Sequence, residues 1–342
     1  MLACLAHRNR AMANGVNFPE MIVPTSAHAA FFKAGEVFRI KCHRIPLDKG
    51  YRVCLRKMEA RINGNTCMLA GSAPNFPFGT VDDIASIGAL GLKYSIPVHV
   101  DACLGGFVLP FLANEDGSIP PFDFRVPGVT SISADTHKYG CTPKGSSVIM
   151  YRDCESRKYQ YFADADWQGG IYASATMEGS RAGMNIAMTW AGMLYHGKEY
   201  YCREAENIRA TTQRFRDGLK QIPEFFIRGE ADTCVVSWGS DDIDIYRYAS
   251  LMESRGWHLG SLQFPAGVHI MVTQLHTATG VVDDFFVDTH AVMDEIRASP
   301  NVAATGRAKL YGQTATIPDR SLVKEFATIY LDATYSMPPE SE

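Results

Sequence analysis

The 342-residue chain has no Cys-x-x-Cys pair, no long apolar run and no basic cluster. Its nine cysteines are scattered and odd in number, which argues against a disulfide framework and favours a reducing compartment. No segment approaches the roughly 18 consecutive apolar residues of a membrane-spanning helix, and residues 1–10 lack the apolar core of a signal peptide. We therefore predict a soluble chain, as given, with no membrane span.

The charge is nearly balanced, with 33 basic and 37 acidic residues and a formal net charge of -4. This balance argues against nucleic acid as a main partner, because no basic surface is available to neutralise phosphates. Internal repeats and low-complexity tracts are also missing, and no metal site is predicted. With 46% hydrophobic and 20% charged residues, the composition is that of a globular protein large enough for two domains.

Apolar runs alternate with helical patterns through the first 151 residues. We expect strands at 21–23, 38–45, 66–70, 96–101, 129–134 and 147–151, and helices at 27–37, 53–62 and 81–94. Alternation of this kind predicts an α/β fold, with a mostly parallel sheet flanked by helices. Its ligand should lie at the carboxyl ends of the strands.

The second half of the chain predicts a different architecture. A long helical pattern over 181–219 suits a connector, and the strands expected at 234–238 and 268–273 alternate with helices at 244–255 and 283–296. The predicted division is a helix within 1–13, a large domain over 14–220, a smaller C-terminal α+β domain over 221–336, and a frayed tail over 337–342.

Two residues at predicted strand ends suggest the chemistry. Lys138 follows the apolar run 129–134, and Asp101 closes another run and is followed by the small residue Ala102. Pyridoxal phosphate needs an acid that pairs with its ring nitrogen and a lysine that holds its aldehyde carbon as a Schiff base. Asp101 and Lys138 can supply these two groups. Taken singly, each has an ordinary alternative, a helix N-cap for Asp101 and a surface lysine for Lys138.

Several motifs resemble those of sphingosine-1-phosphate lyases. The resemblance extends from Leu2 to Tyr335 and rests on residues 24–31, 100–107, 133–147 and 166–172. The segments around Asp101 and Lys138 would also fit other pyridoxal phosphate decarboxylases. The run Trp167-Gln168-Gly169-Gly170 and the stretch 262–265 are more specific to the lyases. The resemblance implies the fold of the type I pyridoxal phosphate-dependent transferases.

The resemblance also implies roles for individual residues. Lys138 would attach the cofactor, Asp101 would pair with its ring nitrogen beside Ala102, and His28 would stack on its ring. His28 would otherwise be a capped core histidine. His137 would contact the cofactor phosphate or make a structural hydrogen bond.

Further candidates lie between residues 144 and 181. Lys144 is expected to be a second cation near the cofactor or a solvated loop lysine, and Tyr172 resembles a tyrosine that reaches the active site. The run Gly179-Ser180-Arg181 resembles an anion-binding turn at a helix start. Gly179 and Ser180 are therefore candidates for the cofactor phosphate, and Arg181 and Lys144 for the substrate phosphate. Because family members are homodimers with sites at the subunit interface, some of these groups are expected to act across it.

The implied reaction is the retro-aldol cleavage of a phosphorylated sphingoid base to a long-chain aldehyde and phosphoethanolamine, an aldehyde-lyase activity in sphingolipid catabolism. Lys144, Tyr172 and the substrate phosphate are all candidates for the base that takes the C3 hydroxyl proton. An amino-acid decarboxylase would keep Asp101, Lys138 and His28, and residues 167–172 favour the lyase over it. A third alternative is an inactive, truncated remnant that only dimerises.

Two expected features of the family are not found in the sequence. A glycine-rich motif for the cofactor phosphate, Gly-Thr-Glu-Ser in type, should come immediately before the helix expected to start at residue 2. The N-terminal membrane anchor of eukaryotic members is missing as well. We expect a full-length eukaryotic member at the endoplasmic reticulum membrane, facing the cytosol, and the chain as given in the cytoplasm.

Overall fold

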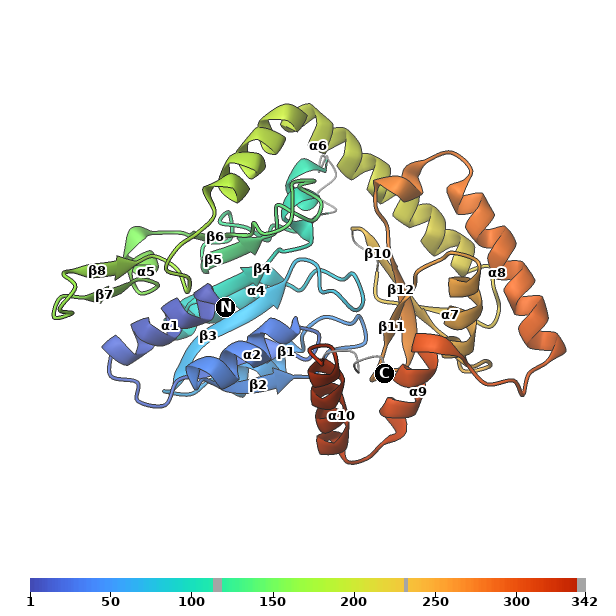
Figure 1. The fold of residues 1–342 in the computed structure, drawn as a ribbon, viewed down its shortest axis with the longest axis horizontal. Coiled ribbons are helices and arrows are strands. Elements are labelled where there is room, and N and C mark those ends of the chain that lie inside the picture. Colours follow the sequence, from blue (N-terminus) through green and yellow to red (C-terminus); the bar gives the residue numbers. More distant parts are fainter. Residues whose placement is uncertain (113–118, 231–232, 337–342) are drawn as a thin grey trace, which may run out of the picture. The chain divides into compact units, whose positions relative to one another are not determined.

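A six-stranded sheet organises the first two-thirds of the chain (Figure 1). The computed structural model describes residues 1–112, 119–230 and 233–336. The expected tail, 337–342, lies outside the described residues. The strand order is β2-β1-β3-β4-β5-β6. The strands are β1 (Glu20–Pro24), β2 (Lys41–Ile45), β3 (Thr66–Ser72), β4 (Val98–Asp101), β5 (Val129–Ala134) and β6 (Val148–Tyr151).

The sheet is parallel except at one edge. Strands β1 to β5 pair in parallel, and β6 pairs antiparallel with β5, with Ala134 opposite Val148. Strand β5 therefore leads through the loop 135–147 straight back into β6. This loop carries Lys138 at the carboxyl end of the parallel strands. The predicted α/β sheet is confirmed.

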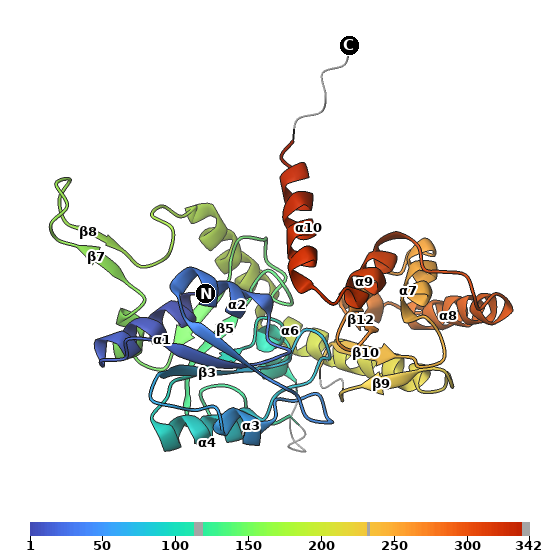
Figure 2. The same cartoon turned by 90° about the horizontal axis from the view of Figure 1, so that it is seen from below.

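Helices cover both faces of this sheet (Figure 2). On one face lie α1 (Leu2–Ala13) and α2 (Ala29–Phe38), and on the other α3 (Leu55–Glu59) and α4 (Ile84–Tyr94). Alternate residues of each strand point to opposite faces. Met21 and Val23 belong to the core cluster under α1 and α2, and Ile22 to the cluster on the α4 side. All three are fully buried, as expected for a strand that is covered on both faces.

Local signals set several helix ends. Helix α2 ends where Arg39 takes a left-handed conformation, with a φ of 54°. The strand expected at 38–45 therefore begins only at Lys41. Helix α4 begins after Asp83, whose side chain accepts a hydrogen bond from the Ser86 amide, so this helix starts three residues later than predicted. The helix expected at 53–62 is shorter and covers only α3.

The chain then leaves the sheet through an extended hairpin. After α5 (Cys154–Lys158), strands β7 (Phe162–Asp164) and β8 (Tyr172–Ser174) pair antiparallel. The hairpin projects away from the six-stranded sheet in both views (Figures 1 and 2). Helix α6 (Gly183–Leu219) follows and is interrupted at Gly197, where φ is 68°. The hairpin was not predicted, because its strands are only three residues long.

The remaining strands and α-helices follow α6, in about the last third of the chain. They are β9 (Phe226–Arg228), β10 (Val235–Gly239), α7 (Ile245–Ser254), β11 (Gly260–Leu262), β12 (Gly267–Met271), α8 (Val281–Ala298), α9 (Gly306–Thr316) and α10 (Arg320–Ala333). Strands β9 to β12 form a four-stranded sheet with the order β11-β12-β10-β9. Short 3-10 helices are η1 (Gly105–Phe107), η2 (Leu109–Phe111) and η3 (Gln274–Thr277). Sequence periodicity did not predict α9 and α10.

The chain divides into two compact units. Of the described residues, the first comprises those within 1–219, 227–237 and 271–282, and the second those within 220–226, 238–270 and 283–336. The predicted boundary at 220 coincides with the end of α6, and two later segments belong to the first unit. In the second unit, buried Trp238 packs against Tyr248 and Phe285. Within the described residues, no helix is long and apolar enough to cross a membrane.

Candidate active site

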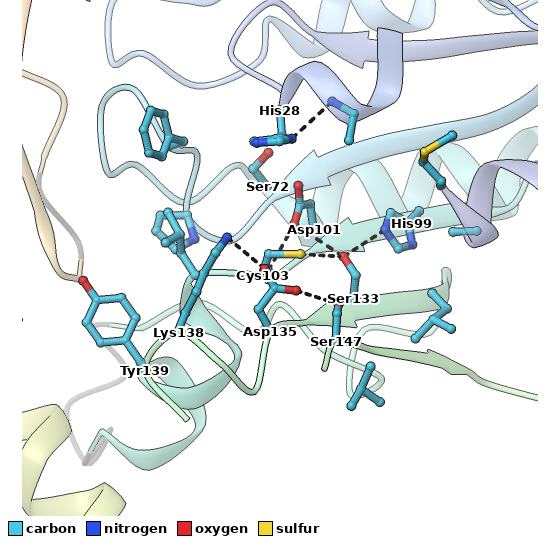
Figure 3. A pocket seen from close by; sticks show the side chains of 18 of the residues that line it. His28, Ser72, His99, Asp101, Cys103, Ser133, Asp135, Lys138, Tyr139 and Ser147 are labelled. Carbon is cyan, nitrogen blue, oxygen red and sulfur yellow. Dashed lines mark hydrogen bonds and ion pairs between the residues drawn. The ribbon is translucent and has the colours of Figure 1, made fainter. Parts of the chain in front are cut away.

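A cavity of about 740 Å³ opens at the carboxyl ends of the parallel strands. Figure 3 shows its side chains. Ser72, Asp101 and Ser133 come from β3, β4 and β5, and Lys138 from the loop after β5. His28 follows β1 at the start of α2 and also lines this cavity. The site thus lies where the fold predicts it, and all of its lining residues belong to the first unit.

Asp101 is the last residue of β4 and is held from one side. Its Oδ1 accepts a hydrogen bond of 3.1 Å from the Cys103 amide and one of 3.4 Å from the Ser133 hydroxyl. Both of these hydrogen bonds reach Oδ1. The second oxygen, Oδ2, is therefore available to a donor in the cavity.

Lys138 is presented by a tight turn. The amide of Lys138 donates to the Asp135 carbonyl, and the amide of Cys141 donates to the Lys138 carbonyl. A side chain on Gly140 would come within 2.4 Å of the Thr136 carbonyl oxygen, so this position requires glycine. Tyr139, the next residue, donates to the Val272 carbonyl at 2.8 Å and anchors the turn.

An ion pair fixes the lysine side chain. The Nζ of Lys138 lies 2.9 Å from Oδ2 of Asp135, and the hydroxyl of Ser147 donates to Oδ1 of Asp135 at 2.6 Å. Burial opposes ionisation of Asp135. The hydrogen bonds from Ser147 and Lys138 outweigh that effect, so the pKa of Asp135 lies below its usual value. The pair places an amine and a carboxylate at the cavity wall.

His28 caps α2. Its Nδ1 accepts a hydrogen bond of 3.2 Å from the Ala30 amide, and its ring is exposed at the cavity. A ring fixed in this way presents a flat face to a planar ligand. The hydrogen bond is the capping interaction of the alternative interpretation, but the exposed ring is not that of a core histidine.

The other sequence candidates lie outside this cavity. His137 does not line it, and its Nδ1 donates to the Ser146 carbonyl at 2.5 Å. Lys144 is exposed in the following loop. Ala102 is fully buried and does not line the cavity. Among the residues that the structure describes, the cavity therefore brings together His28, Asp101 and Lys138.

The candidates of the hairpin region do not line the cavity of this chain. Tyr172 lies on β8 and contacts the rings of Phe162 and Trp167. Gly179, Ser180 and Arg181 are exposed before α6. None of them lines the cavity.

Sequence reasoning missed several polar residues of the site. Asp135, Ser133, Ser147 and His99 line the cavity, as does the thiol of Cys103. Ser133 and Asp135 lie in the same segment as Lys138 and come directly before the turn. Small polar residues at the end of a buried strand were the available signal, because such groups need partners when buried.

The residues present fit pyridoxal phosphate. Lys138 supplies an amine, Asp101 supplies an acceptor oxygen with its other oxygen already bonded, and His28 supplies a flat ring on a third element. The cavity volume lies within the range of small-molecule and cofactor sites, about 300 to 1,000 Å³. A set consisting of one amine, one carboxylate and one ring is what this cofactor requires.

Comparison with known proteins defines the class. Residues 6–239 match the pyridoxal-dependent decarboxylase conserved domain. The chain is 37% identical to a solved structure of a sphingosine-1-phosphate lyase from Burkholderia pseudomallei, with a TM-score of 0.87, covering 98% of this chain and 72% of that one. The chain therefore belongs to the pyridoxal phosphate-dependent decarboxylase-like family, and within it to the sphingosine-1-phosphate lyases.

Curated relatives agree with this assignment. Sphingosine-1-phosphate lyase 1 of Rattus norvegicus is 44% identical over 343 residues, and the lyase of Drosophila melanogaster is 44% identical over 342 residues. This chain spans 60% and 63% of their lengths. A glutamate decarboxylase from Lactobacillus brevis is 20% identical with a TM-score of 0.75, and this likeness shows the type I fold alone.

Proposed function

We propose that the protein cleaves phosphorylated sphingoid bases such as sphingosine 1-phosphate to a long-chain aldehyde and phosphoethanolamine, using pyridoxal 5'-phosphate. The observation that carries the proposal is the presence of Asp101 and Lys138 in one cavity of a chain of this family. The curated relatives are sphingosine-1-phosphate lyases, which favours this reaction over amino-acid decarboxylation. As the chain spans about 60% of these relatives, the whole reaction remains a proposal.

Three residues of this chain would hold the cofactor. Lys138 would attach its aldehyde carbon, with Asp135 placing the amine. Asp101 would accept a hydrogen bond from its ring nitrogen at Oδ2, and His28 would cover one face of the ring. When bound, pyridoxal phosphate supplies an electron sink that takes up the electron pair of a breaking bond.

The chemical step is the cleavage of the substrate C2–C3 bond. A base takes the proton of the C3 hydroxyl, C3 becomes the aldehyde carbon, and C2 receives a proton to give phosphoethanolamine. The candidates for the base are still Lys144, Tyr172 and the substrate phosphate. Gly179, Ser180 and Arg181 would contact phosphate groups, the first two on the cofactor and the third on the substrate, and His137 is a further candidate for the cofactor phosphate.

The proposal includes a homodimer. The β7–β8 hairpin exposes apolar side chains, with Ile171 85% and Trp167 57% exposed, which is unusual for a surface that stays in water. A second copy of the chain would cover these side chains. Tyr172 and the turn at 179–181 do not line the cavity of their own chain, and they would then serve the partner's cavity. Placement of full-length eukaryotic members at the endoplasmic reticulum is a further prediction.

The test is a product assay on the full 342-residue chain. The chain is mixed with pyridoxal phosphate and sphingosine 1-phosphate, and release of long-chain aldehyde and phosphoethanolamine is followed by mass spectrometry. Aldehyde release that is lost in Lys138→Ala supports the proposal. Carbon dioxide release from amino acids without aldehyde formation would contradict it and identify a decarboxylase. Cofactor binding with neither product would indicate that this chain lacks the activity.

A further inference from the structure

A continuous line of hydrogen bonds, buried or partly buried, connects Asp101 with helix α1. Oδ1 of Asp101 lies 3.4 Å from the Ser133 hydroxyl, which lies 3.3 Å from Nε2 of His99. Nδ1 of His99 lies 2.9 Å from the Ser131 hydroxyl, which in turn lies 2.8 Å from Nε2 of His7. The part next to the cavity is visible in Figure 3. We call His7, Ser131, His99 and Ser133 the buried chain.

The buried chain is closed to solvent over most of its length. His7, His99 and Ser131 are 1%, 3% and 0% exposed, and Ser133 lies at the cavity wall. Burial lowers the pKa of His7 to about 3, and the charge of Arg10 adds to that effect. Burial also lowers the pKa of His99 well below its usual value. Both imidazoles are therefore neutral at neutral pH, so each carries one N–H donor and one acceptor nitrogen.

The charge of Asp101 determines the direction of these bonds. A carboxylate can only accept, so the Ser133 hydroxyl donates to it and must accept from His99 Nε2–H. Nδ1 of His99 is then an acceptor, and it receives the Ser131 hydroxyl. Ser131 completes its own bonding by accepting from His7 Nε2–H. Nδ1 of His7 is left as the final acceptor, and it has no hydrogen-bond partner among the described residues.

The opposite direction is unfavourable. If His99 carried its proton on Nδ1, the Ser133 hydroxyl would donate to Nε2 and turn its lone pairs toward Asp101. The carboxylate would then face an oxygen at 3.4 Å without a shared proton. The thiol of Cys103 lies 3.4 Å from the same hydroxyl, and burial and the nearby Asp101 charge raise its pKa, so it stays a protonated donor to Ser133.

We propose that the buried chain positions Asp101. It directs the Ser133 hydroxyl toward Oδ1 and thereby leaves Oδ2 as the acceptor for the ring nitrogen of pyridoxal phosphate. His99 is the central positioning residue, because both of its ring nitrogens take part. The role of these four residues toward the cofactor rests on the proposed function. The direction of their hydrogen bonds does not depend on the cofactor. A purely structural role would only tie α1 to β4 and β5.

The first part of the experiment uses the full chain without cofactor. Histidine labelled with ¹⁵N is incorporated, and two-bond ¹H–¹⁵N spectra at neutral pH report the tautomer of each ring. His99→Gln and His7→Gln assign the two signals. We expect the Nε2–H tautomer for both histidines. An Nδ1–H tautomer or an imidazolium at His99 would overturn the proposed direction.

The second part uses pyridoxal phosphate labelled with ¹⁵N at the ring nitrogen, whose chemical shift reports its protonation. In wild type the nitrogen should be protonated. In His99→Phe the signal should move toward the unprotonated position, and the Kd of the cofactor should rise about tenfold, as expected for one lost charge-assisted hydrogen bond. His99→Gln keeps a donor near Ser133 and should restore most of the wild-type signal.

Matched variants separate this role from general stability. His43→Phe removes another buried histidine of the same sheet, one that is bonded to Glu20 at 2.7 Å, and it should leave the ring-nitrogen signal unchanged. Ser131→Ala interrupts the buried chain without touching Asp101 and should give an intermediate shift. If His99→Phe does not fold, Ser131→Ala and His99→Gln carry the comparison.

The outcomes are distinct. Variants that bind cofactor with a wild-type ring-nitrogen signal, and lose only thermal stability, would overturn the positioning role. A wild-type chain that binds no cofactor would count against the proposed function, and the histidine tautomers alone would then support or overturn the direction of the bonds.

Discussion

Nζ of Lys138 lies 2.9 Å from Oδ2 of Asp135, so an anion three residues earlier places the amine of the proposed cofactor site. Asp135 is itself oriented by the Ser147 hydroxyl, which comes from the far end of the same loop. Asp135 thus bonds two other residues of the loop 135–147, Ser147 and Lys138, and these contacts fix the position of the lysine side chain. Such support is what holds a reactive group in place.

Removing Asp135 should weaken cofactor attachment. Asp135→Ala deletes the carboxylate that holds both Lys138 and Ser147. We expect the Kd of pyridoxal phosphate to rise about tenfold, since hydrogen bonds to charged groups contribute about 1.5–3 kcal/mol each. Ser147→Ala removes only one of the two bonds and should have a smaller effect. Absorbance titration measures both, and an Asp135→Ala variant with wild-type affinity would contradict the placement of Lys138 by Asp135.

Acid should destabilise the protein through His7 and His99. Burial depresses the pKa of both rings in the fold, to about 3 for His7, while unfolded histidine titrates near 6.5. Unfolding therefore takes up protons below pH 6.5. Above pH 6.5 the two histidines do not lower the free energy of unfolding. Below it, they lower that free energy as the pH drops toward 3, by up to about 1.4 kcal/mol per pH unit for each histidine.

Urea unfolding at pH 7.0, 6.0 and 5.5 measures this effect before most carboxylates titrate. His7→Gln should lower the slope of stability against pH by about one proton. An unchanged slope would show that His7 is not buried in its neutral form.

Gly128 should not tolerate a side chain. A Cβ at this position would lie 2.0 Å from the Gly88 carbonyl oxygen, where α4 approaches the start of β5. Backbone cannot give way as a flexible side chain can, so Gly128→Ala should destabilise the fold by about 1–3 kcal/mol. Gly64→Ala is the control, since no atom lies within 4 Å of its added Cβ. Equal melting temperatures for the two variants would contradict the close approach of α4 to β5.

The hairpin should mediate dimerisation. Ile171→Asp places a charge at an apolar side chain that is 85% exposed, and it should convert the expected dimer into monomers. Phe18→Asp changes another exposed apolar residue, 77% exposed and distant in sequence, and should leave the dimer intact. Sedimentation velocity distinguishes the two states. A monomeric wild type, or dimers of Ile171→Asp, would argue against an interface at the hairpin.

The sheet could be predicted because its signals are local. Buried parallel strands such as β3 are continuous apolar runs, and the intervening helices have their own periodicity. The hairpin could not be predicted in this way, because strands β7 and β8 are only three residues long. Helix α10 does carry apolar residues at helical spacing, Leu322, Phe326 and Ile329, so its local signal was present although the helix buries no residue in this chain.

The site was predictable where the chemistry demands a particular residue type. A Schiff-base lysine and a pyridine-pairing acid have few substitutes, so Lys138 and Asp101 could be proposed from strand ends, and the structure places both at one cavity. Asp135 and His99 could not, because their importance depends on which side chains the fold brings within hydrogen-bond distance. The hydrogen bond between His7 and Ser131 joins residues 124 positions apart, so it cannot be inferred from their spacing in the sequence.

The central claim is that Lys138 attaches pyridoxal phosphate, and the most direct measurement locates the attached group. The full chain is incubated with the cofactor, reduced with borohydride and digested, and mass spectrometry finds the pyridoxyl label. We predict a label on Lys138, together with a visible absorbance band that disappears in Lys138→Ala and remains in Lys57→Ala, a change of an exposed lysine on α3. A label spread over surface lysines, or a band retained in Lys138→Ala, would contradict the account.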